Sequence, residues 1–244
     1  MTAAGVPAEV RLAAEGRYLL AVYRRLLGRF GPQGWWPART PFEVAVGAIL
    51  TQAVAWANVE KAIAALEAHG LLEPAALLAA PPERLAELIR PAGYFNAKAR
   101  KLKSFVEFLF ARHDGSLERL FAQPLERARR ELLGVWGIGP ETADSILLYA
   151  GGLPTFVVDA YTRRILSRLW ADPAAPFLRD YDALRRFFME RLVPDPALFN
   201  EYHALLVALG KGVCRKGRPR CADCPLLGLC RFAHEGGGPA VAAR

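Results

Sequence analysis

The first 213 residues of this 244-residue chain contain no cysteine, and the chain has no apolar stretch long enough to cross a membrane. A membrane-spanning helix needs roughly 18 or more uninterrupted apolar residues, and no window reaches that length. The N-terminal stretch lacks a basic start followed by a sustained apolar core, because Glu9, Arg11 and Glu15 interrupt it. We therefore expect a cytoplasmic protein with no membrane partner.

Strand signals are also missing from the sequence. No run alternates convincingly between apolar and polar residues, and we find no long internal repeat and no low-complexity linker. Apolar residues instead recur at helical spacing, in segments that proline or glycine interrupts. These segments are 15–30, 41–70, 73–80, 81–93, 95–115, 125–136, 141–152, 157–171, 180–193 and 200–214. The pattern predicts an all-α fold.

The composition is basic and apolar. Hydrophobic residues make up 53% of the chain, which is enough for a sizeable core and too much for a disordered protein. Lysine and arginine number 32 against 24 acidic residues, giving a formal charge of +8. This excess favours an anionic partner, nucleic acid first, although a solvated basic surface would have the same composition.

All four cysteines lie in one short segment, "CRKGRPRCADCPLLGLC". Cys214, Cys221, Cys224 and Cys230 have the spacing C-x6-C-x2-C-x5-C, and disulfides are not expected in a cytosolic chain. Four thiolates on one loop can hold a zinc ion or an iron–sulfur cluster. Zinc sites usually pair two C-x2-C knuckles, so the unequal gaps favour a 4Fe–4S cluster while leaving zinc open.

The loop between the first two cysteines is strongly basic. It carries Arg215, Lys216, Arg218 and Arg220, which suit contact with phosphate. The same charges could equally serve to offset a negative cluster, and both roles can hold at once.

A glycine-rich turn joins two helical segments in "ELLGVWGIGPETADSILLYA". Gly137 and Gly139 can adopt positive φ and leave no side chain in the way of an approaching group. Pro140 fits the first turn of the following helix, where no N–H is needed. The turn, including Ile138 and Thr142, therefore suits a helix–hairpin–helix whose N–H groups bind a DNA phosphate, although an ordinary corner between two helices remains possible.

With these motifs the chain resembles the endonuclease III superfamily of helix–hairpin–helix DNA glycosylases. "ILTQAVAWANVEKAIAAL" looks like the early helix of that family, whose glutamine, here Gln52, enters the DNA and fills the vacated space. "PAGYFNAKARKLKSF" looks like its second helix pair, and residues 137–169 look like its hairpin and catalytic segment. The cysteine spacing is that of the family's iron–sulfur loop, which adds to the case for a 4Fe–4S cluster.

The resemblance implies two lobes with the DNA between them. We expect residues 1–35 and 146–244 to form an iron–sulfur cluster domain. Residues 36–145 should form a helical domain that ends in the hairpin. The resemblance also makes Asp159 the catalytic carboxylate, which stabilises the positively charged sugar or helps to activate water. From the sequence alone, an aspartate at this place would be interpreted as a helix N-cap.

The sequence departs from the bifunctional members of the family at the position of their catalytic lysine. That lysine stands 18 residues before the aspartate, and 159 − 18 = 141 is Glu141 here. A carboxylate cannot form the imine that the lyase step requires. The sequence therefore predicts a monofunctional glycosylase, unless Lys98, Lys101 or Lys103 supplies the amine.

The choice of base rests on tryptophans. "GWWPARTPFEVAVGAILTQ" contains Trp35 and Trp36, and the 3-methyladenine glycosylase branch of the family has a similar Trp-Trp-Pro segment in its base pocket. That branch also has an aromatic residue four positions after its glutamine, where this chain has Trp56, and Lys211 loosely matches a pocket lysine. Cationic alkylated purines stack well on indoles, although each tryptophan could equally be a core residue. Ala53 and Val54 depart from the branch, which usually has Asn-Thr after the glutamine.

We therefore expect a monomeric, nucleoid-associated DNA glycosylase of base excision repair, acting on damaged double-stranded DNA. It would flip alkylated purines such as 3-methyladenine and 7-methylguanine out of the helix and hydrolyse their glycosidic bonds. Two alternatives remain open: an endonuclease III-type glycosylase/lyase for oxidised pyrimidines, and a catalytically silent protein that binds damaged DNA.

Overall fold

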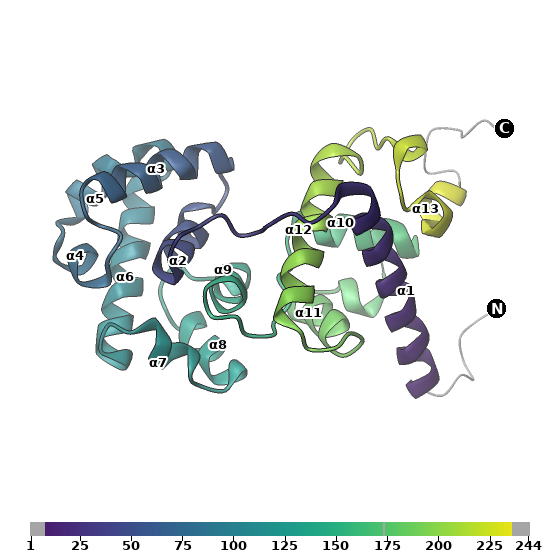
Figure 1. Cartoon of the computed structure of the whole chain (residues 1–244), viewed down its shortest axis with the longest axis horizontal. Helices are drawn as coiled ribbons and strands as arrows, with labels where there is room; N and C mark the ends of the chain where they lie inside the picture. The colour runs from purple at the N-terminus through teal and green to yellow at the C-terminus, as the bar shows by residue number, and fades with distance from the viewer. Residues whose placement is uncertain (1–7, 173, 236–244) are drawn as a thin grey trace. The chain divides into compact units, whose positions relative to one another are not determined.

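The computed structural model describes residues 8–172 and 174–235, and these residues form helices and connecting turns with no β-strand (Figure 1). This confirms the predicted all-α fold. No helix in these ranges is long and apolar enough to cross a membrane.

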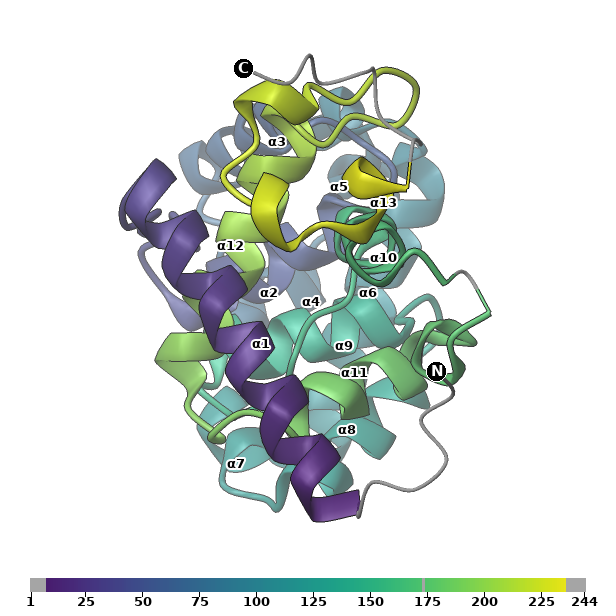
Figure 2. The same ribbon diagram turned by 90° about the vertical axis from the view of Figure 1, so that its right-hand side faces the viewer.

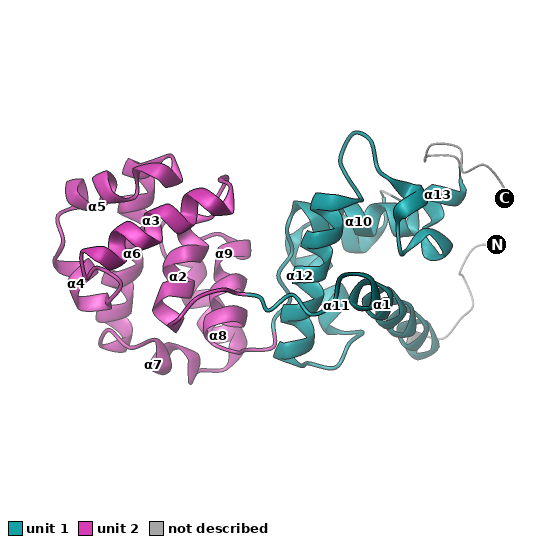
Figure 3. Cartoon of the chain, turned by 45° about the horizontal axis from the view of Figure 1, so that its top comes forward, with its two compact units in different colours: residues 1–35, 155–244 teal, residues 36–154 magenta. Residues whose placement is uncertain are grey.

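The chain divides into two compact units (Figure 3). Unit 1 takes the described parts of 1–35 and 155–244, and unit 2 takes residues 36–154. The second boundary therefore falls nine residues later than the predicted one (154 − 145 = 9). The difference arises because residues 146–150 continue the preceding helix as one π-helical turn and pack on α2 of unit 2.

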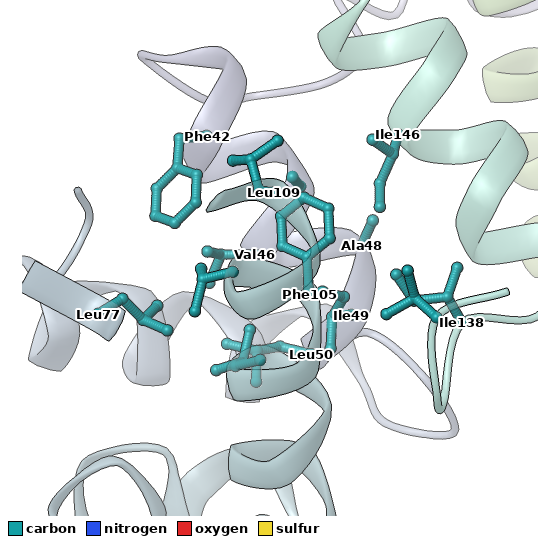
Figure 4. Close-up of a cluster of buried hydrophobic side chains, with 14 of the residues drawn as sticks. Phe42, Val46, Ala48, Ile49, Leu50, Leu77, Phe105, Leu109, Ile138 and Ile146 are labelled. Carbon is teal, nitrogen blue, oxygen red and sulfur yellow. The ribbon is translucent and has the colours of Figure 1, made fainter. Parts of the chain in front are cut away.

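Unit 2 contains the helical domain and the hairpin. Its elements are α2 (Pro41–Leu50), α3 (Trp56–Ala68), α4 (Pro74–Ala79), α5 (Pro82–Leu88), the 3-10 turn η1 (Arg90–Ala92), α6 (Phe95–His113), α7 (Leu117–Phe121), α8 (Leu125–Leu133), α9 (Pro140–Ser145) and the π turn η2 (Ile146–Ala150). The long helix α6 packs against α2, α4 and α5. Figure 4 shows the apolar core that these helices share, with Val46, Phe105 and Ile138 among its members.

The helix α2 is buried along almost its whole length and has defined ends. Thr40 caps its first turn, where Oγ1 accepts the Glu43 N–H at 3.1 Å. At the other end the buried Lys98 of α6 donates to the carbonyl of Leu50 at 2.8 Å and to that of Ala92 at 2.7 Å. Burial, with a smaller contribution from the neighbouring Lys101, lowers the pKa of Lys98 to about 8.

The segment 41–70, which the sequence predicts as one or two helices, forms two helices separated by a turn at residues 51–55. Ala53 has φ 55° in that turn, a left-handed backbone conformation that residues other than glycine rarely adopt. Gln52 therefore lies in a turn between α2 and α3, and not on a helix as the sequence resemblance implied.

Unit 1 contains α1 (Ala8–Phe30), α10 (Ala160–Trp170), η3 (Pro176–Leu178), α11 (Tyr181–Met189), α12 (Pro196–Gly212), η4 (Cys221–Asp223), η5 (Leu227–Leu229) and α13 (Arg231–His234). Figure 2 shows α1 beside α12, with which it makes extensive contact. The buried Tyr202 hydroxyl of α12 donates to the Leu19 carbonyl of α1 at 2.9 Å. Phe156 stacks on Phe188 with 3.7 Å between ring centroids, so the segment before Asp159 is anchored in the core.

Candidate nucleic-acid interface and catalytic residue

The hairpin between α8 and α9 requires glycine at one of its two predicted positions. Gly137 has φ 83°, and a Cβ there would collide with the stem of Lys101. Gly139 faces open space, with nothing within 4 Å of an added Cβ. Gly137 is therefore fixed by conformation and packing, whereas Gly139 leaves the backbone open to an approaching group.

Ile138 anchors the hairpin from inside. Its side chain is buried in the core of unit 2, and its N–H donates to the Val135 carbonyl at 3.1 Å (Figure 4). The buried Ile138 side chain thus anchors the turn, and the predicted contact of the turn's N–H groups with a DNA phosphate stays a prediction. The backbone that remains for an anion is at Gly139 and in the first turn of α9, where N–H groups have no carbonyl four residues earlier within the helix.

Gln52 is held against the hairpin. Its amide nitrogen lies 3.1 Å from the Gly137 carbonyl and 2.9 Å from Thr142 Oγ1, and its Oε1 accepts from Lys101 Nζ. Both ends of the amide are therefore occupied in this conformation. A Gln52 that fills a vacated space in DNA would first have to exchange these partners.

The helix pair that carries the hairpin is locked by a buried ion pair. Arg129 of α8 and the fully buried Asp144 of α9 meet through three contacts of 3.0–3.2 Å. Glu141 is exposed in the first turn of α9, where the helix dipole favours a carboxylate. Thr142 is buried and its hydroxyl oxygen accepts a hydrogen bond from Gln52. Its predicted DNA contact would therefore have to come from its backbone.

Asp159 begins α10 in unit 1. Its Oδ1 accepts the Thr162 N–H at 2.7 Å, so the residue is the N-cap that the sequence suggested. Its Oδ2 lies 3.8 Å from Nε2 of His203 on α12, and the Asp159 side chain is 13% exposed. Burial lowers the pKa of His203, although the nearby Asp159 charge opposes the shift. Burial thus favours the neutral form of the imidazole beside a mostly buried carboxyl group that keeps a path to solvent.

The four cysteines line one cavity in unit 1, together with apolar residues. Burial raises the pKa of the Cys224 thiol to about 11, and the other three cysteines add to the shift. Among the described residues no three histidine, cysteine or acidic side chains converge as ligands of one metal ion. A 4Fe–4S cluster binds each thiolate through a different iron, so it does not require such convergence, and its positive irons favour deprotonated thiols.

Arg168 of α10 connects the helix to the cysteine segment. Its guanidinium lies 3.1 Å from Cys214 Sγ and donates to the carbonyls of Arg215 and Lys216 at 2.8 and 2.9 Å. It also lies over the ring of Phe232. One side chain therefore orders the start of the basic loop and faces the sulfur of a predicted ligand.

The basic loop is exposed to solvent. Arg215, Lys216, Arg218 and Arg220 all present their side chains at the surface of unit 1. Arg220 is paired with Asp223 at 2.8 Å, so its charge is partly compensated. The other three cations are the stronger candidates for contact with phosphate.

Comparison with known proteins places this geometry in a family. The model of the HhH-GPD superfamily of base excision DNA repair proteins matches residues 46–193, which include the hairpin and Asp159. A candidate DNA repair glycosylase of Methanocaldococcus jannaschii, MJ1434, is 44% identical over 86% of this chain and 94% of its own length.

The chain belongs to the HhH-GPD superfamily. It is a DNA glycosylase of the base excision repair type.

Two solved structures share the HhH-GPD fold. The 3-methyladenine DNA glycosylase MagIII of H. pylori, bound to 1,N6-ethenoadenine, superposes with a TM-score of 0.69 and 28% identity, covering 81% of this chain and 97% of that one. Endonuclease III in a non-covalent DNA complex gives a TM-score of 0.73 and 24% identity, covering 90% and 97%.

Two of the predicted pocket tryptophans meet in unit 2. Trp36 packs edge-on against Trp56 with 5.0 Å between centroids, and Tyr149 lies 5.3 Å from Trp36 on η2. All three are half-buried, and Trp36 also lies against Gly47 of α2. Trp35 and the exposed Lys211 belong to unit 1, and their part in a base pocket stays a prediction.

Several residues near the predicted site were not predicted from the sequence. His203 beside Asp159 and Arg168 beside Cys214 come from helices whose apolar spacing says nothing of a polar partner. Trp136 is 50% exposed and Tyr94 is 76% exposed, with φ 44°. Both residues lie in or beside motifs that carry the family resemblance, in "GVWGIG" and "AGYFNAK", which is a reason to consider them for a functional role. The sequence does not indicate that their side chains are exposed.

Proposed function

We propose that this HhH-GPD protein is a monofunctional DNA glycosylase that removes alkylated purines and leaves an abasic site. The observation that carries the monofunctional assignment is Glu141, an exposed carboxylate at the position of the bifunctional members' lysine. The amine of Lys101 donates to Gln52, Lys98 is buried, and Lys103 donates to the carbonyls of Leu78 and Ala80. None of these three lysines therefore presents an unengaged amine to a sugar in this conformation.

Asp159 would be the catalytic carboxylate. As the base departs, positive charge builds up on the sugar, and an ionised carboxylate in a mostly buried position stabilises that charge. Its Oδ1 is committed to the Thr162 N–H, so Oδ2 is the oxygen left to face the sugar or a water molecule. A neutral His203 next to Oδ2 adds no charge that would compete with the sugar, and it restricts where the carboxylate can turn.

The aromatic cluster supports an electron-poor base. Trp36, Trp56 and Tyr149 place electron-rich rings in one part of unit 2, and a cationic purine gains roughly 1–2 kcal/mol from such contact. The likeness to MagIII, whose name is 3-methyladenine DNA glycosylase, supports a methylated purine as the base. Because alkylation at N3 or N7 also weakens the glycosidic bond, little acid catalysis would be needed.

DNA would be held at two places. The hairpin offers the open backbone at Gly139 and the start of α9, and the basic loop offers Arg215, Lys216 and Arg218. Phosphate contacts release counterions, so binding should weaken steeply with salt. Replacing Arg215 and Arg218 by alanine should flatten that slope, whereas an unchanged slope would show that the basic loop faces away from DNA.

We infer that Cys214, Cys221, Cys224 and Cys230 hold a 4Fe–4S cluster. When bound, the cluster supplies four iron–thiolate bonds that fix residues 214–230, and the glycosylase reaction itself requires no electron transfer. Arg168 would face the sulfur of Cys214 and so place the basic loop at the cluster's edge. Iron and sulfide analysis of anaerobically purified protein tests this, and stoichiometric zinc without iron would reject it.

One assay separates the candidate functions. Labelled duplexes containing 3-methyladenine, 7-methylguanine, thymine glycol or uracil are incubated with the protein, with and without subsequent alkali. Release of free 3-methyladenine and 7-methylguanine above a control without protein, with strand breaks only after alkali, supports the proposal. Breaks without alkali would instead show a glycosylase/lyase. Binding to DNA without any base release would show a silent binding protein, and preference for a neutral base would reject the proposed substrate class.

A further inference from the structure

Trp136 stands at the hairpin as a large aromatic side chain in contact with water. It is one of four large hydrophobic residues that are exposed in the described part of the chain, with 50% of its surface accessible. Its neighbours Val135 and Ile138 are both buried and anchor the hairpin in the core. Packing of the hairpin therefore does not explain why position 136 carries an indole.

Arg100 lies over the Trp136 ring. Its guanidinium carbon is 4.6 Å from the ring centroid, and the side chain reaches it from the exposed face of α6. Such a cation–π contact is worth roughly 0.5–1 kcal/mol at an exposed site. The contact restricts the indole before any ligand arrives, so little side-chain entropy remains to be lost on binding.

The pair lies directly beside the open backbone of the hairpin. Trp136 precedes Gly137, and the next residue of α6, Lys101, lays its stem against that glycine. A strand whose phosphate sits at Gly139 and the first turn of α9 would bring the adjoining nucleotide to Trp136. Two cationic side chains on the same turn of α6 match the charge of that strand.

We propose that Trp136 and Arg100 form a stacking platform for the nucleotide that adjoins the phosphate held by the hairpin. The indole packs against the base or the sugar of that nucleotide, and the guanidinium holds the ring and adds positive charge. Because every base has a π-face, the contact is independent of sequence. This inference rests on the proposed function, in which the hairpin binds a DNA phosphate.

The competing explanation is a purely structural role, here called a brace, in which the contact between Arg100 and Trp136 only stabilises the packing of the hairpin on α6. A brace and a platform predict different results when the aromatic ring is kept. Trp136→Phe keeps a π-face that can stack, whereas Trp136→Leu keeps an apolar side chain without one. Arg100→Gln removes the charge above the ring, and Arg112→Gln, on the same helix and also exposed, is the matched control.

The experiment measures affinity for a duplex with a tetrahydrofuran abasic analogue at several salt concentrations. Trp136→Leu should weaken binding by about 5- to 150-fold, the range for loss of one stacked base, with the salt slope unchanged. Trp136→Phe should retain most of the affinity. Arg100→Gln should weaken binding and reduce the slope of log affinity against log salt by up to about 0.9, the contribution of one phosphate contact. Arg112→Gln should have the affinity and the salt slope of the wild type.

Photocrosslinking locates the contact. Duplexes with 5-iodouracil at successive positions near the analogue are irradiated with the full-length protein, and the crosslinked peptide is identified by mass spectrometry. A crosslink at Trp136 from one or two adjoining positions, lost in Trp136→Leu, supports the platform. Wild-type affinity in Trp136→Leu, or equal weakening and equal loss of thermal stability in Trp136→Leu and Trp136→Phe, overturns it in favour of a brace.

DNA binding by the wild type distinguishes failure of the stacking platform from failure of the proposed function. Salt-dependent binding by the wild type with unaffected Trp136 and Arg100 variants leaves the proposed function in place and rejects only the platform. No salt-dependent binding by the wild type rejects both.

Discussion

The side-chain amide of Gln52 lies 2.9 Å from Thr142 Oγ1, and this contact joins the turn after α2 to the first turn of α9. The same nitrogen reaches the Gly137 carbonyl, so Gln52 positions the hairpin from the side. The residue that resemblance assigns to the DNA interior thus also supports the hairpin that we propose to bind a DNA phosphate.

Replacing Gln52 should therefore affect the free protein as well as the complex. Gln52→Leu removes both donors and should lower the free energy of unfolding by about 1–3 kcal/mol, the cost of leaving the partly buried Gly137 carbonyl without its donor. Urea unfolding measures the change. Lys101→Met is the control, because it removes only the bond to Gln52 Oε1 and leaves both hairpin contacts in place. Unchanged stability in Gln52→Leu would show that the contacts form only transiently.

The buried pair of Arg129 and Asp144 should be the more costly one to break. Asp144→Asn removes the carboxylate that makes three contacts with the buried Arg129 and should destabilise the protein by roughly 3–5 kcal/mol. Glu87→Gln, which breaks the exposed pair with Arg84, should have little effect. Thermal unfolding of the two variants in parallel gives the comparison, and equal midpoints would contradict it.

Lys98 gives a prediction with a defined pH dependence. Lys98→Met leaves the carbonyls of Leu50 and Ala92 without their buried donor and should cost about 2–4 kcal/mol. Because folding lowers the pKa of Lys98 from 10.5 to about 8, the unfolded chain binds the proton more tightly. The stability that Lys98 contributes should therefore rise as the pH increases from about 8 towards 10.5.

Unfolding curves of wild type and Lys98→Met at pH 7.5 and at pH 9.5 test that sign. The difference in free energy between the two proteins should be larger at the higher pH. A difference that shrinks as the pH increases would mean that the ammonium form is the one the fold prefers.

Most helices were predictable from the sequence, since apolar spacing and the breaks at glycine and proline both act within one segment. Gly31 and Gly70, for example, follow the ends of α1 and α3 with positive φ. The short helices α7 and α13 were not predicted. The predicted boundary at residue 145 differs from the end of unit 2 at residue 154, and the π-helical turn at residues 146–150 lies between the two. Whether Ile146 and Leu147 belong to one core or another depends on contacts with α2, which are distant in sequence.

The candidate site was predictable to the extent that single motifs carry it. The glycines of the hairpin, the aspartate that caps α10 and the cysteine segment each lie in one stretch of chain. Contacts between stretches were not predictable, such as those of His203 with Asp159 and of Lys101 with Gln52. The burial of the Ile138 side chain was likewise not predicted from the sequence.

The cysteine segment should lose its order when the cluster is removed. Anaerobically purified protein should be yellow-brown with broad absorbance near roughly 400 nm, as expected of thiolate-ligated iron. Cys221→Ser should lose this absorbance and weaken DNA binding, because Cys221 is the most buried of the four cysteines proposed to hold the cluster. Binding of methylated duplex by the wild type before and after iron chelation provides the test. Unchanged affinity would separate the cluster from the basic loop.

Arg168→Met tests the link between the cluster and the loop. The variant loses the contact with Cys214 and the two bonds to the carbonyls of Arg215 and Lys216. Iron content should stay near that of the wild type, because all four ligands remain, while DNA affinity falls and protease cleavage within residues 215–220 becomes faster. Equal cleavage rates would show that the loop is ordered by the cluster alone.

In the proposed function, Asp159 supplies the catalytic carboxylate and Glu141 replaces the lysine that the lyase step requires. Asp159→Asn keeps the size of the side chain and its ability to cap α10, so folding and DNA binding should remain near those of the wild type. Base release should fall by orders of magnitude, since a charged group that stabilises the transition state in a sheltered site is worth roughly 3–4 kcal/mol. Single-turnover release of 3-methyladenine from methylated duplex measures this. A small effect would make Asp159 a structural cap only.

The second half of the prediction is that no imine forms. Borohydride should trap no covalent adduct between wild-type protein and DNA, because Glu141 has no amine to attack the sugar. Glu141→Lys should gain trapping if α9 presents position 141 to the sugar as in bifunctional members. Glu83→Lys, at the matching place in the first turn of α5, is the control and should trap nothing. Efficient trapping by the wild type, abolished in Lys101→Met, would instead make Lys101 the nucleophile and the protein a glycosylase/lyase.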